Sequence, residues 1–182
     1  MLYQLLQLHP VRALSRTLWR PLCLLALCLL AACAAPFDAD ARLSADVPTR
    51  AQVTGVPLIQ QEAFFCGPTS IAMVMQWAGA TVAPADIAQL AFTPGAGGTY
   101  QADMIGSSRR LGQLVVPLTG MDDLLTEVAA GHPVIVFQNL GVAIAPVWHY
   151  GVVTSYDLDR ETISLNSGQR AQMIMPVSYT HL

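Results

Sequence analysis

Residues 60–77 are QQEAFFCGPTSIAMVMQW, and this stretch predicts a helix that begins beside a cysteine. Pro68 has the fixed φ that suits a first helical turn, and it lacks an N–H that would have no partner there. Within residues 71–78 the only polar side chain is Gln76, and Gly79 can end the helix. We therefore expect this helix to run through the core of the protein.

Cys66 stands where the first N–H groups of that helix and the positive end of its dipole point outward. Such a position stabilises the thiolate, which is the form of cysteine that attacks carbonyl carbons. Free cysteine is also among the residue types most often buried in cores, so a structural role is the alternative. The side chains that accompany Cys66 must decide between the two.

The first 32 residues are predicted to be an export signal. Three arginines within residues 12–20 precede an apolar run at 22–30, which is too short to span a bilayer comfortably. Residues 30–33, Leu-Ala-Ala-Cys, resemble the bacterial lipoprotein cleavage box. The resemblance implies that residues 1–32 are removed and that Cys33 carries a lipid. An ordinary signal peptide cut near Ala35 is the alternative.

Residues 33–52 are polar, contain two prolines and show little apolar pattern, so we expect them to form a tether. Ala34 follows the cysteine, and in Gram-negative lipoproteins this points to the outer membrane. The sequence therefore predicts an exported protein, anchored by lipid on Cys33 at the periplasmic face of the outer membrane.

This processing leaves one cysteine in the folded part of the chain. Cys23 and Cys28 would leave with the signal, and Cys33 would carry the lipid. Cys66 would then have no partner for an internal disulfide in an oxidising compartment. An unpaired thiol in that setting favours a chemical role for Cys66.

After the cysteine helix the pattern changes from helices to strands. We expect helices at 81–90 and 101–111, and a further helix that Thr119 caps and Gly131 follows. Strands are expected at 114–118 (at an edge, because of Pro117), 133–138 (buried on both faces), 148–156, 162–166 and 172–175. Helices followed by a largely antiparallel sheet predict an α+β fold.

Composition excludes several classes of partner. The 182 residues suffice for one domain, the net charge is −3, and the chain contains no lysine. There is no basic block beyond the N-terminus, so nucleic acid is not an expected partner. One cysteine and one histidine do not fill a zinc shell, so neither a metal nor another cofactor is expected.

A catalytic thiol needs a base, and the base needs a side chain that orients it. Among the four histidines, His149 opens an expected core strand beside two aromatic residues, where the imidazole could be held rigidly. Asn166 ends the neighbouring strand and could lie beside His149. The alternatives are a hydrogen-bonded structural histidine and an ordinary asparagine at the end of a strand.

Hydrolysis also needs donors for the oxyanion. The Cys66 N–H is one, and the side-chain amide of Gln60 or Gln61 could supply a second. Either glutamine could instead be an ordinary surface residue.

Together these residues resemble the papain-like cysteine peptidases, and more closely the exported, stand-alone lipoprotein branch of the bacterial double-glycine peptidase family. The stretches that carry the resemblance are Gln60/Gln61, Cys66-Gly67-Pro68-Thr69-Ser70, residues 93–95, 109–112, 131–140 and 148–153, and Leu165-Asn166-Ser167-Gly168. The resemblance implies a papain-like peptidase domain at 53–175, with a Cys66-His149-Asn166 triad. It also implies a thioester intermediate, and a peptide or protein as substrate.

The chain departs from the family pattern at several points. The family's oxyanion glutamine commonly lies six residues before the cysteine, which selects Gln60, whereas the exported branch favours the position of Gln61. Many relatives have Asp where this chain has Asn166. The chain also lacks the transporter domains of the leader peptidases, so cleavage after a Gly-Gly pair is not implied. Residues 176–182 continue no earlier pattern, and we expect them to be artefactual or truncated.

Two other functions fit the sequence. One is a different papain-like acyl transfer, as in an amidase, a transpeptidase or a transglutaminase-like enzyme. The other is a catalytically silent periplasmic binding or assembly module.

Overall fold

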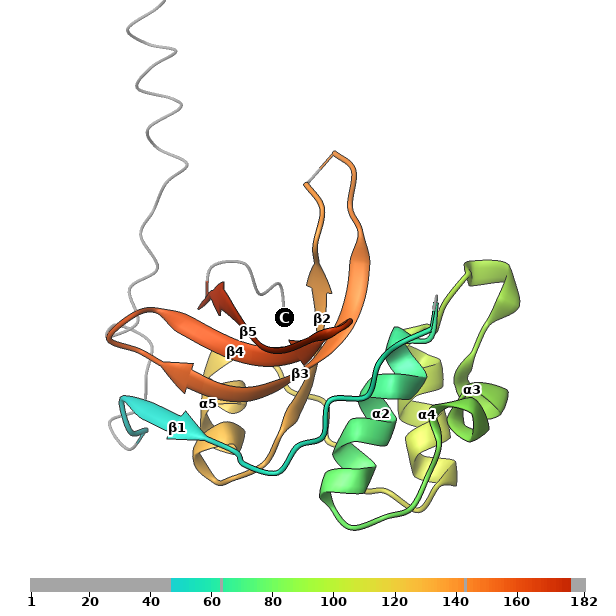
Figure 1. Ribbon diagram of the computed structural model, residues 1–182, viewed down its shortest axis with the longest axis horizontal. Helices are drawn as coiled ribbons and strands as arrows, with labels where there is room; N and C mark the ends of the chain where they lie inside the picture. Colours follow the sequence, from blue (N-terminus) through green and yellow to red (C-terminus); the bar gives the residue numbers. More distant parts are fainter. Residues whose placement is uncertain (1–46, 63, 143, 178–182) are drawn as a thin grey trace, which may run out of the picture. The chain divides into compact units, whose positions relative to one another are not determined.

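The computed structural model describes residues 47–62, 64–142 and 144–177, in which the helices precede most of a five-stranded sheet (Figure 1). The elements are β1 (Arg50–Gln52), α2 (Cys66–Trp77), α3 (Pro84–Ala91), the short 3-10 helix η1 (Pro94–Ala96), α4 (Gln101–Arg110), α5 (Met121–Ala129), β2 (Val134–Asn139), β3 (Trp148–Asp157), β4 (Thr162–Ser167) and β5 (Arg170–Pro176). No helix among these residues is long and apolar enough to cross a membrane.

Strand β3 organises the sheet, in which all pairs are antiparallel. The first part of β3 pairs with β2, from Asn139 opposite Trp148 to Val134 opposite Val153. The last part pairs with β1, so β1 and β2 lie one after the other along the same edge of β3. Strand β4 takes the opposite edge, and β5 pairs with β4. These pairings connect the N-terminal strand with residues about a hundred positions later in the chain.

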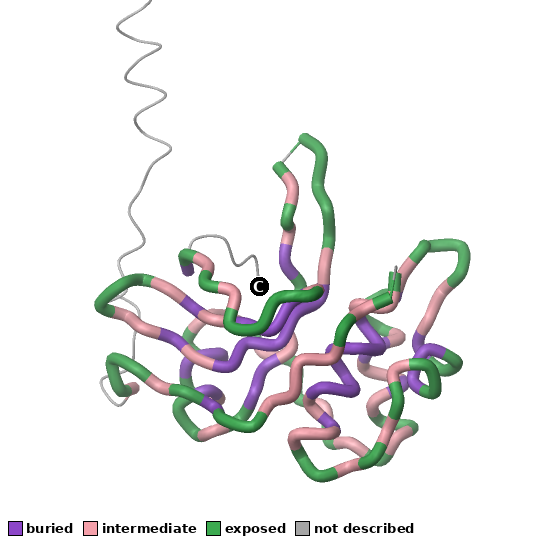
Figure 2. The backbone as a smooth tube through the Cα atoms, in the orientation of Figure 1, coloured by how far each residue is buried: buried purple, intermediate pink, exposed green. Residues whose placement is uncertain are grey.

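Helix α2 packs on the sheet through one hydrophobic cluster. The buried residues of this cluster are Ile71, Ala72, Met75, Ile87, Ala91, Met104 and Tyr150. Figure 2 shows buried backbone in the central strands and along α2. Complete burial of a Leu or Ile side chain contributes about 1.5–3 kcal/mol, so this cluster fixes α2 against the start of β3. Helix α5 contacts β1, β2 and β3, and its Leu124, Leu125 and Val128 are also buried.

Most predicted elements are present, and the predicted α+β class is confirmed. The cysteine helix ends at Trp77, with Gly79 following in the left-handed region at φ 90°. The cap of α5 differs from the prediction, because Gly120 is the N-cap. Asp123 instead accepts hydrogen bonds from the Thr119 N–H (2.8 Å) and hydroxyl (2.7 Å). Strand β2 alternates in burial, so the prediction that it is buried on both faces is wrong.

The strand predicted at 114–118 is also wrong. These residues form no strand, and Leu114 and Val116 are 92% and 64% exposed. Pro117 cannot donate to a ladder, and none of the sheet's strands pairs with these residues. Residues 114–118 therefore lie on the surface as an apolar segment that pairs with no strand.

The predicted domain boundaries need correction at both ends. Part of the predicted tether is strand β1, and Pro48 O accepts a hydrogen bond from the Tyr156 hydroxyl (2.8 Å). At the other end, Pro176 closes β5, and Val177 is buried and donates its N–H to Glu161 O (2.9 Å). The folded unit therefore begins before residue 53 and includes Val177. The predicted signal at 1–32 and the rest of the tail lie outside the described residues.

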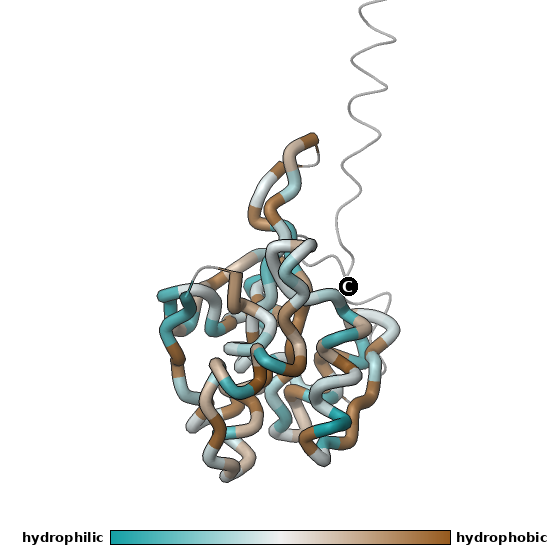
Figure 3. The backbone as a smooth tube through the Cα atoms, turned by 90° about the vertical axis from the view of Figure 1, so that its right-hand side faces the viewer, coloured by the Kyte–Doolittle hydropathy of each residue, from teal (hydrophilic) through white to brown (hydrophobic). Residues whose placement is uncertain are grey.

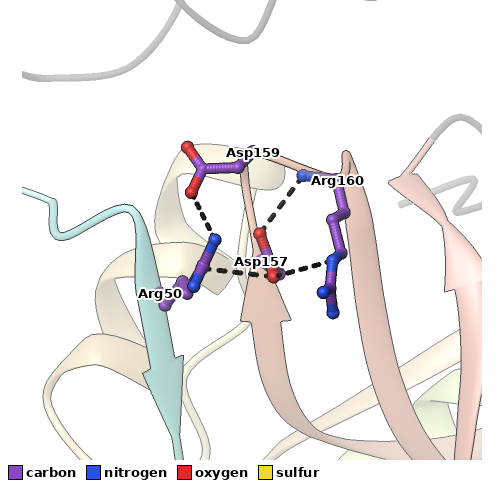
Figure 4. A network of polar contacts seen from close by, with 4 residues as sticks. All are labelled: Arg50, Asp157, Asp159 and Arg160. Atoms are coloured by element: carbon purple, nitrogen blue, oxygen red, sulfur yellow. Dashed lines mark hydrogen bonds and ion pairs between the residues drawn. The ribbon is translucent and has the colours of Figure 1, made fainter.

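Ion pairs fasten β1 to the sheet (Figure 4). Arg50 contacts Asp157 on β3 (3.2 Å) and Asp159 in the following turn (2.6 Å), and the two carboxylates raise the pKa of Arg50. Arg160 approaches Asp157 from the other side, at 3.7 Å. A three-residue strand is too short to show a sequence pattern of its own. Strand β1 is defined by its pairing with β3 and by these ion pairs, so the sequence alone did not predict it.

Candidate active site

Cys66 is the first residue of α2, and its free thiol is partly buried. The helix begins without a side-chain cap, so the first-turn N–H groups are not blocked by one. Gly67 allows close packing here, because a Cβ at this position would lie 2.8 Å from both Thr99 Cβ and Met104 Sδ. Phe64, just before the helix, has a positive φ of 68°, which is uncommon for a bulky residue. The chain therefore enters α2 through a tight turn that holds Cys66 near the surface.

Tyr150 connects Cys66 with the start of β3. The side chain of Cys66 packs against the cluster that contains Tyr150. Burial raises the pKa of Tyr150 to about 12, and the charges of Cys66 and Asp103 add to this effect. His149 is the neighbour of Tyr150 in the strand. Helix α2 thus places Cys66 near the start of β3, where His149 also lies, although His149 and Tyr150, as adjacent strand residues, point to opposite faces.

His149 is partly buried, and burial lowers the pKa of its imidazole. The neutral ring is therefore favoured near neutral pH, and a neutral imidazole can accept a proton from a thiol. The ring nitrogen Nε2 is buried without a hydrogen-bond partner. The inward edge of the ring thus retains an unused hydrogen-bonding position.

Asn166 lies on β4 opposite Val152, and its contacts differ from those predicted. Its amide nitrogen donates to Val56 O (3.3 Å), and its oxygen accepts the Gln172 N–H (3.2 Å). Side chains alternate between the faces of a strand, so Asn166 shares the face of Val152, and His149 lies on the other face. The amide of Asn166 therefore braces the segment before α2 and makes no hydrogen bond to His149.

The two candidate oxyanion glutamines have different environments. Gln60 is exposed, whereas Gln61 is partly buried. Nε2 of Gln61 is itself buried and has no hydrogen-bond partner. Gln61 therefore has a donor held inside the protein that no other group uses.

Several buried polar atoms on or beside these elements have no hydrogen-bond partner. Within the described residues, the buried side-chain atoms without a partner are Gln61 Nε2, Ser70 Oγ, Thr99 Oγ1, Gln138 Oε1 and His149 Nε2. Ser70 lies on α2, Thr99 abuts Gly67, and Gln138 is opposite His149 in the sheet. Most buried polar groups are satisfied, so such a group of exceptions is typical of a functional site.

Gln138 is not among the site residues that the sequence predicts. It is completely buried, although it follows an apolar run near the end of β2. The signal in the sequence that could have indicated a role is a long polar side chain directly after an apolar run. Its partner could be found only from the register of β2 and β3.

The hairpin that joins β2 and β3 projects from the sheet and carries hydrophobic residues along its length (Figures 1 and 3). At its base, Phe137 stacks on Trp148 with ring centroids 5.0 Å apart, and it contacts Tyr150 at 4.5 Å. Phe137 and Trp148 are both partly open to solvent, at 40% and 49% exposure. Three aromatic side chains therefore lie together at the start of β3, and two of them, Trp148 and Tyr150, flank His149 in the sequence.

The described residues contain no group of three His, Cys, Asp or Glu side chains that could hold a metal ion. The chemistry that can be derived from these residues is that of a thiol, an imidazole and amide donors.

Comparisons with known proteins find a similar family and similar folds. Residues 53–174 match the Peptidase_C39 like family. A protein of Bacillus anthracis described as a C39-like peptidase has a similar structure, with 22% identity, a TM-score of 0.57, and coverage of 71% of this chain and 89% of that one.

The peptidase domain of Streptococcus ComA, a bifunctional ABC transporter involved in a quorum-sensing pathway, is also similar. It has 19% identity, a TM-score of 0.55, and coverage of 69% of this chain and 90% of that one. These two structures confirm the predicted papain-like fold. No curated protein matches the chain significantly.

Proposed function

Because this chain belongs to the Peptidase_C39 like family, and is thus a cysteine peptidase, we propose that it hydrolyses peptide bonds with Cys66 as nucleophile and His149 as base. The observation that carries this assignment is the position of Cys66 at the start of α2, which packs near the start of β3, where His149 lies partly buried. The lowered pKa of His149 also supports it, because a neutral ring can take the thiol proton.

In the first half of the reaction, His149 accepts the proton of Cys66 Sγ, and the sulfur attacks the carbonyl carbon of the substrate. The Cys66 N–H and Gln61 Nε2 donate to the oxyanion that forms. One such donor contributes roughly 3 kcal/mol to stabilising the transition state in known oxyanion holes. The C–N bond then breaks, His149 protonates the leaving amine, and a thioester remains on Cys66.

In the second half, His149 takes a proton from a water molecule, and the resulting hydroxide attacks the thioester carbonyl. The C–S bond breaks, the peptide leaves with a new carboxyl group, and the proton returns to Cys66. Gln61 is preferred to Gln60 as the side-chain donor because its Nε2 is buried and unpartnered. Asn166 is the orienting residue that the sequence predicts, although its contacts lie elsewhere.

The test is a comparison of the wild-type protein and Cys66→Ala on a proteome-derived peptide mixture in ¹⁸O-labelled water. We expect cleavages that need Cys66, with ¹⁸O in the new carboxyl groups and a transient acyl adduct on Cys66. Equal cleavage by Cys66→Ala would exclude the mechanism. Products that join an added amine, without incorporation of ¹⁸O, would indicate acyl transfer instead.

We also propose that the protein is exported and anchored by lipid on Cys33, on the strength of the residue pattern at 1–33 alone. Metabolic labelling with a fatty acid, followed by cell fractionation, tests this. Cys33→Ser should lose the label and leave the outer-membrane fraction, whereas Cys23→Ser, which changes only the signal that is removed, should behave as wild type. A labelled Cys33→Ser protein would contradict the anchor.

A further inference from the structure

Gln138 is a buried amide that lies directly opposite His149 in the sheet. The two residues are register partners in β2 and β3, so their side chains point to the same face. Cβ atoms of such partners are about 4.5–5.5 Å apart, which is within reach of two long side chains. Gln138 is 0% exposed.

Each of these side chains has one buried atom without a partner, and the two atoms are complementary. On Gln138 the atom is the carbonyl oxygen Oε1, an acceptor. On His149 it is Nε2, which is a donor in one tautomer of the neutral ring. The two are not hydrogen-bonded in this structure. Hydrogen bonds in active sites without substrate are often long or poorly aligned, and they tighten when substrate binds.

The other end of the Gln138 amide is already held. Its Nε2 donates to Ser167 Oγ on β4 (2.9 Å). The amide lies over Gly151, where a Cβ would be 3.1 Å from Gln138 Nε2 and 2.8 Å from Leu165 Cδ1. The missing side chain at Gly151 therefore leaves room for a glutamine that runs from β2 across β3 to Ser167 on β4.

We propose that Gln138, held by Ser167, is the positioning residue that orients the imidazole of His149. This inference rests on the proposed function of Cys66 and His149. In the proposed arrangement, Gln138 Nε2 still donates to Ser167 Oγ, and Gln138 Oε1 accepts the His149 Nε2–H. That hydrogen bond fixes the tautomer in which Nδ1 carries no proton, so Nδ1 is the atom that takes the proton of Cys66. Asn166, which lies on β4 and on the other face of the sheet, keeps its role as a brace.

The test uses the full chain and needs no substrate. NMR of protein labelled with ¹⁵N-histidine reports the tautomer of His149, whose signals are identified by their loss in His149→Gln. We expect the Nε2–H tautomer in the wild-type protein. A wild-type ring that carries its proton on Nδ1 would overturn the proposal, whatever the variants do.

The variants separate Gln138 from Asn166. In Gln138→Ala we expect loss of the tautomer preference and at least a roughly tenfold fall in kcat with KM unchanged. Gln138→Glu, which keeps an acceptor oxygen, should restore both, and Asn166→Ala should keep the Nε2–H tautomer. A normal tautomer in Gln138→Ala together with a lost one in Asn166→Ala would assign the role to Asn166.

These outcomes are distinct from failure of the proposed function. If the wild-type protein cleaves no peptide, the peptidase assignment fails while the tautomer still reports on Gln138. If the wild-type protein cleaves peptides and the tautomer is wrong, only the role of Gln138 fails.

Discussion

The two ends of strand β3 treat their polar groups in opposite ways. At the Asp157 end, the charges are paired at the surface, and Arg50 connects Asp157 with Asp159 (Figure 4). At the His149 end, polar atoms are buried, and Nε2 of the ring has no partner. The paired end joins β1 to the sheet, whereas the unpaired end retains hydrogen-bonding capacity close to Cys66. One end of β3 thus anchors β1, and the other end, the chemical end, carries the proposed base His149.

Removing His149 should reveal the largest difference between these ends. His149→Gln takes away the base, and general-base catalysis typically contributes 10²–10⁴-fold, so we expect a fall in kcat of about that size. Arg160→Gln, at the other end of β3, is the matched control and should change kcat by less than about twofold. Steady-state kinetics on a cleaved peptide measures both. If His149→Gln keeps most of its kcat, His149 is not the base, and the two ends of β3 do not differ in their effect on catalysis.

The donors before α2 should have the next largest effect. Gln61→Ala removes an unpartnered buried donor, and loss of one oxyanion donor lowers kcat by about 10²–10³-fold. Gln60→Ala removes an exposed amide one position away, so we expect almost no change. The same assay compares the two variants. The reverse result would assign the oxyanion position to Gln60.

Acidity should destabilise the chemical end of β3. The pKa of His149 is lowered from 6.5 by burial, so the unfolded chain binds more protons than the folded one below that value. The contribution of His149 to stability is therefore constant above the ordinary pKa and is lost as the pH falls toward the folded pKa. Urea unfolding at about pH 7.5 and about pH 5 measures it. Wild type should lose more stability on acidification than His149→Gln, and equal losses would mean that the ring is not desolvated.

The paired end should give the smallest effect. Arg50→Ala removes exposed ion pairs, which contribute little and are screened by salt. We expect unchanged kcat and a small fall in melting temperature that shrinks as salt is added. A large fall, independent of salt, would show that β1 supports the sheet through more than its charges.

Periodic, buried elements could be predicted from the sequence. The apolar run of α2 and the strand pattern of β3 carry their own signal, because burial of one face repeats along them. Strand β1 could not be predicted, since it has three residues and is held by pairing with Ser155, Tyr156 and Asp157. Residues 114–118 have a strand-like composition, but composition does not show whether a segment lies beside a sheet edge and pairs with it.

The site divides in the same way. Cys66 and His149, the proposed nucleophile and base, could be selected from chemical type and local context. Gln138 could not, because its relation to His149 depends on the register of two strands. Asn166 follows the family's order along the chain, but strand alternation places its side chain on the other face from His149. Chain order alone does not show the direction of a side chain.

The central claim is that the sulfur of Cys66 and the imidazole of His149 act together. The most direct measurement is the rate at which iodoacetamide alkylates Cys66 between about pH 5 and about pH 9, in wild type and in His149→Gln. We predict fast alkylation of the wild-type thiol near neutral pH, and a slower reaction with a changed pH profile in His149→Gln. Identical profiles for the two proteins would contradict the account, because they would show that the thiol does not sense the imidazole.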